Sequence, residues 1–248
     1  MGSLHLGPDA TADLGRCIRL FRAFRREQTD PDHFYRVLAD DSVAQLAGFV
    51  DLDGARVLDV GGGPGYFRDA FMRAGARYIS VDSDLGEMSA RGEPMPGGVL
   101  GSGMALPIKD GAVDVCYSSN VLEHVPMPWR MAEEMLRVTR PGGLVFCSFT
   151  VWLSPWGGHE TAPWHYLGGA FAARRYERTH GHPPKNTFGV SLFAVSVADA
   201  LRWARHAPGA ALVAAFPRYH PWWARWTIHL PLLRELTTWN LVLVLAKP

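Results

Sequence analysis

A run of glycines follows directly after a short apolar segment, and this junction constrains the fold more than any other part of the chain. Residues 57–67 read Val-Leu-Asp-Val-Gly-Gly-Gly-Pro-Gly-Tyr-Phe, and a helical pattern follows. We therefore predict a strand, a tight turn and a helix. Glycine suits such a turn because it adopts backbone angles closed to other residues and lets a ligand approach the main chain. The sequence thus predicts ligand binding over Gly61, Gly62, Gly63 and Gly65.

Two common nucleotide-binding patterns do not fit this turn. The dinucleotide fingerprint G-x-G-x-x-G needs a third glycine at position 66 or 68, where the chain has Tyr66 and Arg68. A phosphate-binding P-loop needs Gly-Lys and then Ser or Thr, and these do not follow. A nicotinamide-dependent oxidoreductase is thereby disfavoured, although it stays as an alternative.

A carboxylate stands at the tip of the next predicted strand. Residues 76–81 have a strand pattern that ends in Asp82, about 20 residues beyond Gly61. At that spacing an acid can accept hydrogen bonds from both ribose hydroxyls of a nucleoside. The alternative role for Asp82 is the N-cap of the following helix, for which Asp84 is better placed. We therefore expect a nucleoside-bearing cofactor across the first two strand tips.

Four motifs in order resemble the class I S-adenosylmethionine-dependent methyltransferases. They read D-x-G-G-G-x-G (59–65), G-S-G-M-A-L-P-I (101–108), D-V-C-Y-S-S-N-V-L-E-H-V (114–125) and R-P-G-G-L (140–144). The resemblance is to the small-molecule and ubiquinone-biosynthesis-like group called methyltransferase type 11. It implies S-adenosyl-L-methionine as cofactor. It also implies a doubly wound α/β fold with a mostly parallel seven-stranded sheet, an antiparallel edge strand and N-terminal helices as a lid.

The resemblance also implies which residues contact the cofactor. Asp59 would hold the methionine end through the glycine turn, and Asp82 would hold the ribose. Tyr35 is a candidate residue of the lid, with a plain core position as its alternative. The loop after the fourth strand, with Ser118 and Ser119, would lie beneath the methionine moiety and face the acceptor.

Ser102 departs from the family pattern, which generally has Asp there to accept from the adenine amino group. A serine oxygen still accepts a hydrogen bond, and Gly103 and Met104 would pack on the ring. Residues 119–122 read Ser-Asn-Val-Leu. This differs from the Asn/Asp-Pro-Pro-Tyr/Phe expected of a nucleic-acid amino-methyltransferase. Because the formal net charge is also only +1, no nucleic-acid partner is expected.

Three histidines are candidates for catalysis. A hydroxyl acceptor must lose a proton during methyl transfer, and histidine is the natural base. His124 adjoins the cofactor loop, whereas His159 and His165 belong to a Trp-, Gly- and Pro-rich loop predicted to roof the site. Glu160 would orient His159. A metal site from His159, Glu160 and His165 is conceivable, but no spacing demands one, so no metal is expected.

The chain divides into three predicted parts: an N-terminal helical lid (1–50), the cofactor-binding core (51–150), and an acceptor-binding insertion with the last strands (151–248). Residues 11–28 predict a basic amphipathic helix that packs on the domain and leaves a solvated basic face, with contact to a membrane surface or an acidic partner as the alternative. A second helix is expected from Asp30-Pro31 toward Phe49, and an antiparallel pair of strands at 211–216 and 238–246. The arginines of the first helix are Arg16, Arg19, Arg22, Arg25 and Arg26.

Tryptophans beside Arg and His fill residues 219–233, a composition suited to a bilayer interface. The wall of an acceptor pocket or a dimer contact would explain them as well, and nothing fixes the oligomeric state. Cys17, Cys116 and Cys147 lack disulfide or metal spacing, which suits a reducing compartment. We expect a cytoplasmic protein, with a peripheral contact at the inner membrane face as a hypothesis.

These features together predict an S-adenosylmethionine-dependent O-methyltransferase that acts on a small-molecule, lipid or glycan acceptor. The remaining alternatives are the nicotinamide-dependent oxidoreductase and a nucleoside-binding module without catalysis. Binding of the cofactor rather than NAD would exclude the first alternative, and product formation would exclude the second.

Overall fold

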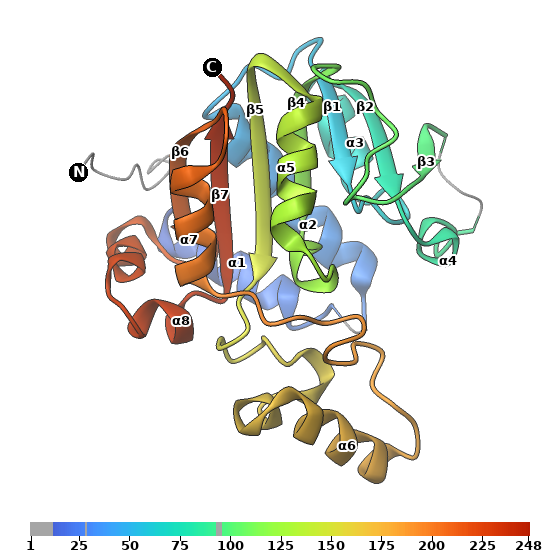
Figure 1. The fold of residues 1–248 in the computed structure, drawn as a ribbon, viewed down its shortest axis with the longest axis vertical. Coiled ribbons are helices and arrows are strands. Elements are labelled where there is room, and N and C mark those ends of the chain that lie inside the picture. Colours follow the sequence, from blue (N-terminus) through green and yellow to red (C-terminus); the bar gives the residue numbers. More distant parts are fainter. Residues whose placement is uncertain (1–11, 28, 93–95) are drawn as a thin grey trace.

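A seven-stranded sheet forms the centre of the computed structural model, which describes residues 12–27, 29–92 and 96–248 (Figure 1). The strand order is β3-β2-β1-β4-β5-β7-β6. β7 runs antiparallel to both β5 and β6, and the pairs from β3 to β5 are all parallel. The predicted fold class is confirmed, with β7 and β6 as the antiparallel pair at the edge.

The bounds of the elements are as follows. The strands are β1 (Arg56–Val60), β2 (Arg77–Asp82), β3 (Gly98–Leu100), β4 (Val113–Ser119), β5 (Thr139–Thr150), β6 (Ala211–Pro217) and β7 (Asn240–Ala246). The helices are α1 (Leu14–Phe24), α2 (Pro31–Ala47), α3 (Arg68–Arg73), α4 (Leu85–Met88), α5 (Pro128–Val138), α6 (Gly169–His180), α7 (Val197–His206) and α8 (Leu233–Thr237). Short 3₁₀ turns are η2 (Leu122–His124), η3 (His159–Thr161), η4 (Trp164–Leu167) and η5 (Trp222–His229). Among the helices described, none has the length and apolarity needed to cross a bilayer.

Capping residues set the starts of several helices. Asp30 accepts from the His33 amide and Pro31 takes the first position of α2, as predicted. Asp84 caps α4 by accepting from the Gly86 amide at 2.6 Å, which confirms its predicted role. The expected limits of the first helix, residues 11 and 28, lie outside the described residues.

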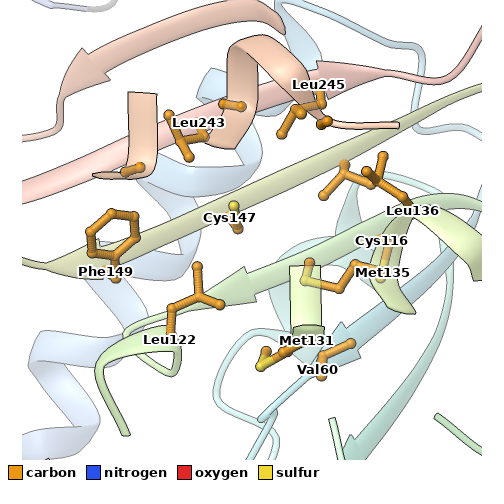
Figure 2. Packing of buried hydrophobic residues seen from close by; sticks show 14 of the residues in the cluster. Val60, Cys116, Leu122, Met131, Met135, Leu136, Cys147, Phe149, Leu243 and Leu245 are labelled. Atoms are coloured by element: carbon orange, nitrogen blue, oxygen red, sulfur yellow. The ribbon is translucent and has the colours of Figure 1, made fainter. Parts of the chain in front are cut away.

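Apolar side chains cover both faces of the sheet. On one face, α5 and α7 close over a cluster that includes Met131, Met135, Cys147 and Leu243 (Figure 2). On the other face, α1, α2 and α3 pack over a more aromatic cluster around Tyr117. Because both faces are covered, the carboxyl ends of the parallel strands are the natural place for a ligand. Residues 151–195 lie beyond those ends, with α6 the most distant element (Figure 1).

Two buried arginines link the N-terminal helices to the sheet. Arg16 is only 3% exposed, and its guanidinium donates to both carboxylate oxygens of Asp41, at 2.5 and 2.7 Å. It also donates to the main-chain oxygen of Arg218 at 2.9 Å. Arg218 in turn donates to the hydroxyls of Ser42 (3.0 Å) and Ser148 (2.8 Å). These contacts tie α1 and α2 to β5 and to the end of β6.

The expectation that Arg16 lies on a solvated basic face is therefore wrong. Asp41, 25 residues further along the chain, supplies the partner that makes its burial possible, and the sequence gives no local sign of this pairing. The other four arginines of the segment, Arg19, Arg22, Arg25 and Arg26, are exposed as expected.

Replacing Asp41 by Asn should strongly destabilise the chain, because it leaves the buried Arg16 without an opposite charge. We expect a loss of about 3–5 kcal/mol in the free energy of unfolding. The measurement is urea-induced unfolding followed by circular dichroism. The neighbouring Asp40→Asn variant is the matched control, since Asp40 pairs with Arg73 at an exposed site and should cost less than about 1 kcal/mol. Equal losses in the two variants would contradict the assignment.

Candidate functional site

The glycine turn after β1 is pressed against the loop after β4. Gly61 has a φ of +78°, and a Cβ added there would lie 2.3 Å from a methyl group of Val121. Gly63 has a φ of +49°, and nothing lies within 4 Å of the position its Cβ would occupy. Gly61 is therefore required by packing, whereas Gly63 faces open space beside which a ligand can approach the main chain.

Asp82 lies beside this turn, at the tip of β2. Its Oδ2 accepts from the Gly63 amide at 2.9 Å, and its Oδ1 accepts from the Asp84 amide at 3.0 Å. Each carboxylate oxygen accepts two hydrogen bonds, so both keep capacity for ribose hydroxyls. The carboxylate thus shapes the turn as well as standing where the ribose is predicted to bind.

Asp59 lies beneath the turn rather than in front of it. The side chain is 1% exposed, and its Oδ2 accepts from the Tyr78 hydroxyl at 2.5 Å. Burial raises the pKa of Asp59 to about 7, and the negative charge of Asp82 acts in the same direction, while the Tyr78 hydrogen bond opposes both. A Cβ at Gly62 would lie 3.2 Å from Asp59 Oδ2. Asp59 therefore acts on a ligand through the main chain of the turn.

Tyr35 of α2 stacks on Tyr66, which directly follows the glycine turn, with ring centroids 4.4 Å apart. The Tyr35 hydroxyl donates to Glu27 Oε1 at 3.3 Å. Arg91 lies over the Tyr66 ring and pairs with Asp32 of α2. These contacts bring the N-terminal helices to the glycine turn. Tyr35 therefore lies where a residue of the predicted lid is expected.

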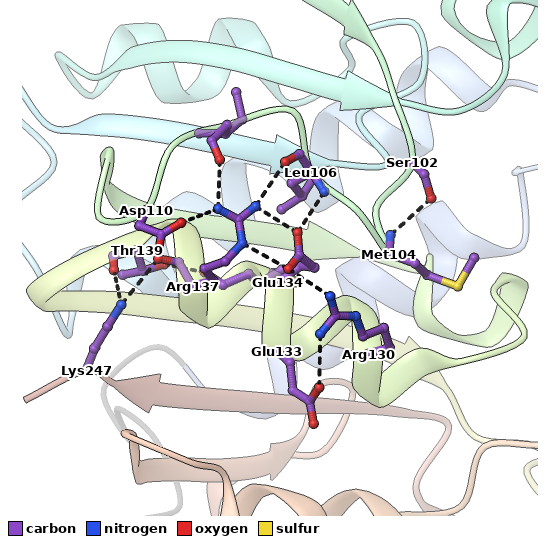
Figure 3. Close-up of polar contacts among 12 residues, drawn as sticks. Ser102, Met104, Leu106, Asp110, Arg130, Glu133, Glu134, Arg137, Thr139 and Lys247 are labelled. Atoms are coloured by element: carbon purple, nitrogen blue, oxygen red, sulfur yellow. Dashed lines mark hydrogen bonds and ion pairs between the residues drawn. The ribbon is translucent and has the colours of Figure 1, made fainter.

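The segment predicted to flank adenine is anchored to α5. Glu134 Oε2 accepts from the Leu106 amide at 2.9 Å, and Arg137 donates to the Leu106 carbonyl at 2.9 Å (Figure 3). The Ser102 hydroxyl accepts from the Met104 amide at 3.2 Å and so stabilises the turn that also contains Gly103. This fixed segment follows β3, next to the tip of β2.

The two serines of β4 differ in what they offer a ligand. Ser118 is fully buried, and its hydroxyl donates to the Val60 carbonyl at 2.7 Å. That side chain joins β4 to β1, which argues against direct contact with the cofactor. Ser119 is half-buried, and its hydroxyl accepts from Ser148 at 3.2 Å. Of the two serines, Ser119 is the one whose side chain can contact a ligand at the end of β4.

His124 and His159 come together although they are far apart in the sequence. Their ring centroids are 5.0 Å apart. The Nδ1 of His124 donates to the Ser191 carbonyl at 2.8 Å, and His159 Nδ1 is 3.4 Å from the Gly157 carbonyl. His159 has a φ of +49°, a backbone conformation that few residues other than glycine adopt.

His165 lies apart from this pair. It is 1% exposed, and its Nε2 donates to the Ser154 carbonyl at 3.1 Å. A Cβ at Gly158 would lie 2.6 Å from its ring, so the imidazole fills the space beneath the loop. This placement argues against the predicted catalytic role. Glu160, predicted to orient His159, instead accepts from the Asn186 amide group at 2.8 Å.

Glu123 is the residue that the sequence analysis missed. It is 1% exposed, and its Oε1 accepts from the Thr150 amide at 2.8 Å. One ligand atom from each of Glu123, His124 and His159 lies within 4.8 Å of the other two. The only signal was the position of Glu123 beside His124, because the sequence gives no distance to His159.

Comparison with known proteins identifies the kind of chain that carries this site. Residues 58–147 match a family described as "Methyltransferase domain". A relative from Mycobacteroides abscessus, named "Uncharacterized methyltransferase", is 58% identical over 247 residues, covering 94% of this chain and 95% of the relative. A relative of the same name from Mycobacterium bovis is 56% identical over 248 residues, covering 95% and 96%.

Solved structures of more distant proteins share the fold. A methyltransferase in complex with the Trm112 activator of Haloferax volcanii superposes with a TM-score of 0.56 at 17% identity, covering 94% of this chain and 97% of that one. An S-adenosylmethionine-dependent methyltransferase from Mesorhizobium loti superposes with a TM-score of 0.55 at 20% identity, covering 85% and 97%. At these identities the likeness concerns the fold.

Replacing Asp59 by Asn should remove a pH dependence of stability. The pKa of Asp59 is about 7 in the folded chain and ~3.9 when unfolded. Between these values the folded state keeps a proton that the unfolded state releases, so wild-type stability falls as the pH rises. Relative to Asp59→Asn, the wild type should lose on the order of 4 kcal/mol from pH ~4 to above pH ~7. Urea unfolding across this range measures it, and a constant difference between the proteins would refute it.

Proposed function

The chain belongs to the class I S-adenosylmethionine-dependent methyltransferases, and we propose that it methylates a hydroxyl oxygen of a small-molecule, lipid or glycan acceptor. S-adenosylmethionine is its cofactor. The observation that carries the proposed acceptor chemistry is the pair of His124 and His159 rings, of which His124 belongs to the loop after β4 that packs on the glycine turn.

The residues at the strand tips fit this cofactor. The open space at Gly63 would take its amino-acid end, Asp82 its ribose, and the segment from Ser102 to Met104 its adenine. When bound, the cofactor supplies an electrophilic methyl carbon on a sulfonium sulfur. The protein's tasks are then to align the acceptor with that carbon and to exclude water.

The histidine pair handles the proton of the acceptor. As the acceptor oxygen forms its bond to the methyl carbon, the carbon–sulfur bond breaks, its electron pair stays on sulfur, and the hydroxyl proton leaves. Burial lowers the pKa of His159, and the positive form of His124 would lower it further, so the imidazole of His159 is neutral near pH 7. A neutral imidazole beside the acceptor oxygen favours release of that proton.

A second candidate is transfer to an amine, which is favoured by the carboxylates around the pair. Burial raises the pKa of Glu27, the hydrogen bond from Tyr35 opposes this, and the carboxyl groups of Glu123 and Glu160 raise it further. A cationic acceptor would be attracted to such a group. Hydroxyl transfer is preferred because the His159 ring, beside His124, offers a proton acceptor to a hydroxyl group.

The acceptor class is tested with methyl-labelled cofactor and a panel of hydroxyl, amine and thiol compounds, including long-chain lipids and glycosides. We expect label in the hydroxyl compounds. The Asp82→Ala variant should bind the demethylated cofactor product more weakly by on the order of 2–4 kcal/mol, measured by calorimetry, because ribose loses its charged acceptor.

Asp84→Asn is the matched control, since Asp84 caps α4 at the same strand tip and should leave cofactor affinity close to that of the wild type. Label in amines alone would refute hydroxyl transfer. Unchanged affinity in Asp82→Ala would refute the ribose role.

We further propose that the chain meets an anionic membrane surface through an aromatic face. This face comprises Trp222, Trp223 and Trp226 of η5 with Leu14 and Ile18 of α1, all of which are exposed. The Trp222 amide donates to the Ala12 carbonyl at 2.8 Å, which brings the two segments together. Exposed Arg19 and Arg22 on α1 add positive charge. Tryptophan and arginine together suit the headgroup region of a bilayer.

Cosedimentation with vesicles containing anionic lipid tests this contact. Replacing all three tryptophans of the aromatic face by Ala should weaken binding by about tenfold or more, because the variant loses apolar area that the bilayer would bury. Trp164→Ala is the control, since Trp164 is exposed but lies beneath Arg175 in the segment that leads into α6. Equal vesicle binding by the triple tryptophan variant and by Trp164→Ala would refute the proposed membrane contact.

A further inference from the structure

We propose that Glu123, His124 and His159 form a binding site for one divalent transition-metal ion, which holds the acceptor oxygen for methylation. We expect an ion that prefers imidazole ligands, as Zn²⁺ does. This inference rests on the proposed hydroxyl transfer for its role, but the site itself rests on the geometry of these three side chains.

Each histidine has its Nδ1 opposite a main-chain carbonyl, as histidines that bind metals usually do. The Nδ1 of His124 is occupied by the Ser191 carbonyl, and that of His159 faces the Gly157 carbonyl. A ligating histidine almost always donates its second ring nitrogen in this way, which fixes the tautomer and leaves the Nε2 lone pair for the ion. The pair therefore offers two Nε2 atoms, with His124 held more firmly than His159.

Glu123 supplies the negative charge. One carboxylate oxygen, Oε1, is held by the Thr150 amide, while the fully buried Oε2 has no hydrogen-bond partner among the described residues. A buried carboxylate oxygen without a partner is costly and calls for a cation or a donor. The main-chain oxygen of Glu123 also accepts from the Phe193 amide, so this turn is fixed from both sides.

The surroundings carry further negative charge. Glu160 Oε2 is likewise buried and has no hydrogen-bond partner within the described chain. Lys185 forms its ion pair with Glu87 of α4. A divalent ion beside His159 would offset this excess of negative charge.

The composition of the set indicates the class of ion. Two imidazoles with one carboxylate form a set found in catalytic zinc sites, which keep a further position open for water or substrate. Imidazole ligands favour first-row transition metals over Mg²⁺ or Ca²⁺, which prefer oxygen. The ligand atoms, which lie within 4.8 Å of one another, would need to come up to about 1.4 Å closer together to surround a tetrahedral ion.

An open position on the ion explains what the site does for transfer. The acceptor oxygen would occupy it. With the ion bound, both imidazoles are ligands and no longer accept the hydroxyl proton themselves, and the positive charge of the ion would favour loss of that proton to water. The oxygen would then form its bond to the methyl carbon as described above, with the sulfur keeping the electron pair. The ion is neither oxidised nor reduced, so no further reactant is needed.

The test uses the full-length protein without a histidine tag, freed of metal by a chelator. Zn²⁺ binding is measured by calorimetry, and Co²⁺ binding by the visible absorption of its coordinated form. We expect one ion per chain. Glu123→Gln and His159→Asn should each weaken binding by about 100-fold or more. Glu123→Gln keeps an oxygen for the Thr150 amide, and Asn tolerates the positive φ of position 159.

His182→Asn is the control, because His182 is exposed and lies outside the cluster. It should bind the ion as the wild type does. Absence of binding, or one affinity shared by all four proteins, would overturn the metal site. Binding of the demethylated cofactor product, measured on the metal-free protein, should be the same in all four. If that binding persists while no metal binds, the metal site is refuted and the methyltransferase assignment stands.

Discussion

The contact between Gly61 and Val121 is the constraint on which the candidate site depends. Because Gly61 has no side chain, the loop after β4 packs directly on the turn after β1. The loop after β4 contains Glu123 and His124, and the turn after β1 is predicted to bind the cofactor. Any larger residue at position 61 would push the two loops apart. The strand order, which reverses between β1 and β4, places this contact where ligands bind in open α/β sheets.

Buried charge holds the surroundings of the site in place. Arg16 and Arg218 link α1 and α2 to β5 and to the end of β6, and Ser148, which accepts from Arg218, donates to Ser119 at the end of β4. This chain of hydrogen bonds connects the N-terminal helices to the loop that is predicted to face the acceptor. Arg218 Nε is buried without a hydrogen-bond partner among the described residues, and the bonds that the two arginines do make favour one arrangement of the helices on the sheet. The helices that carry Tyr35 are therefore positioned by polar contacts as well as by the core.

Local patterns in the sequence were sufficient to predict the first half of the sheet. The glycine turn, the spacing to Asp82 and the caps at Asp30 and Asp84 each depend on residues close in the chain. The position of β7 between β5 and β6, the burial of Arg16 against Asp41, and the meeting of Glu123 with His159 depend on contacts across long stretches of chain. No periodicity encodes such contacts. The separation of His165 from the cluster was missed for the same reason, because its burial depends on the shape of the loop around Gly158.

The electrostatics at the strand ends limit which acceptors are compatible with the site. Glu123 and Glu160 bring two carboxyl groups into this region, and each has a buried oxygen without a hydrogen-bond partner among the described residues. A cation must offset that charge, as a metal ion or as part of the acceptor. An ammonium group would satisfy the carboxylates but would leave the oriented Nε2 atoms of His124 and His159 unused. A metal ion uses the carboxylate and both imidazoles, and an oxygen acceptor bound to it completes the coordination.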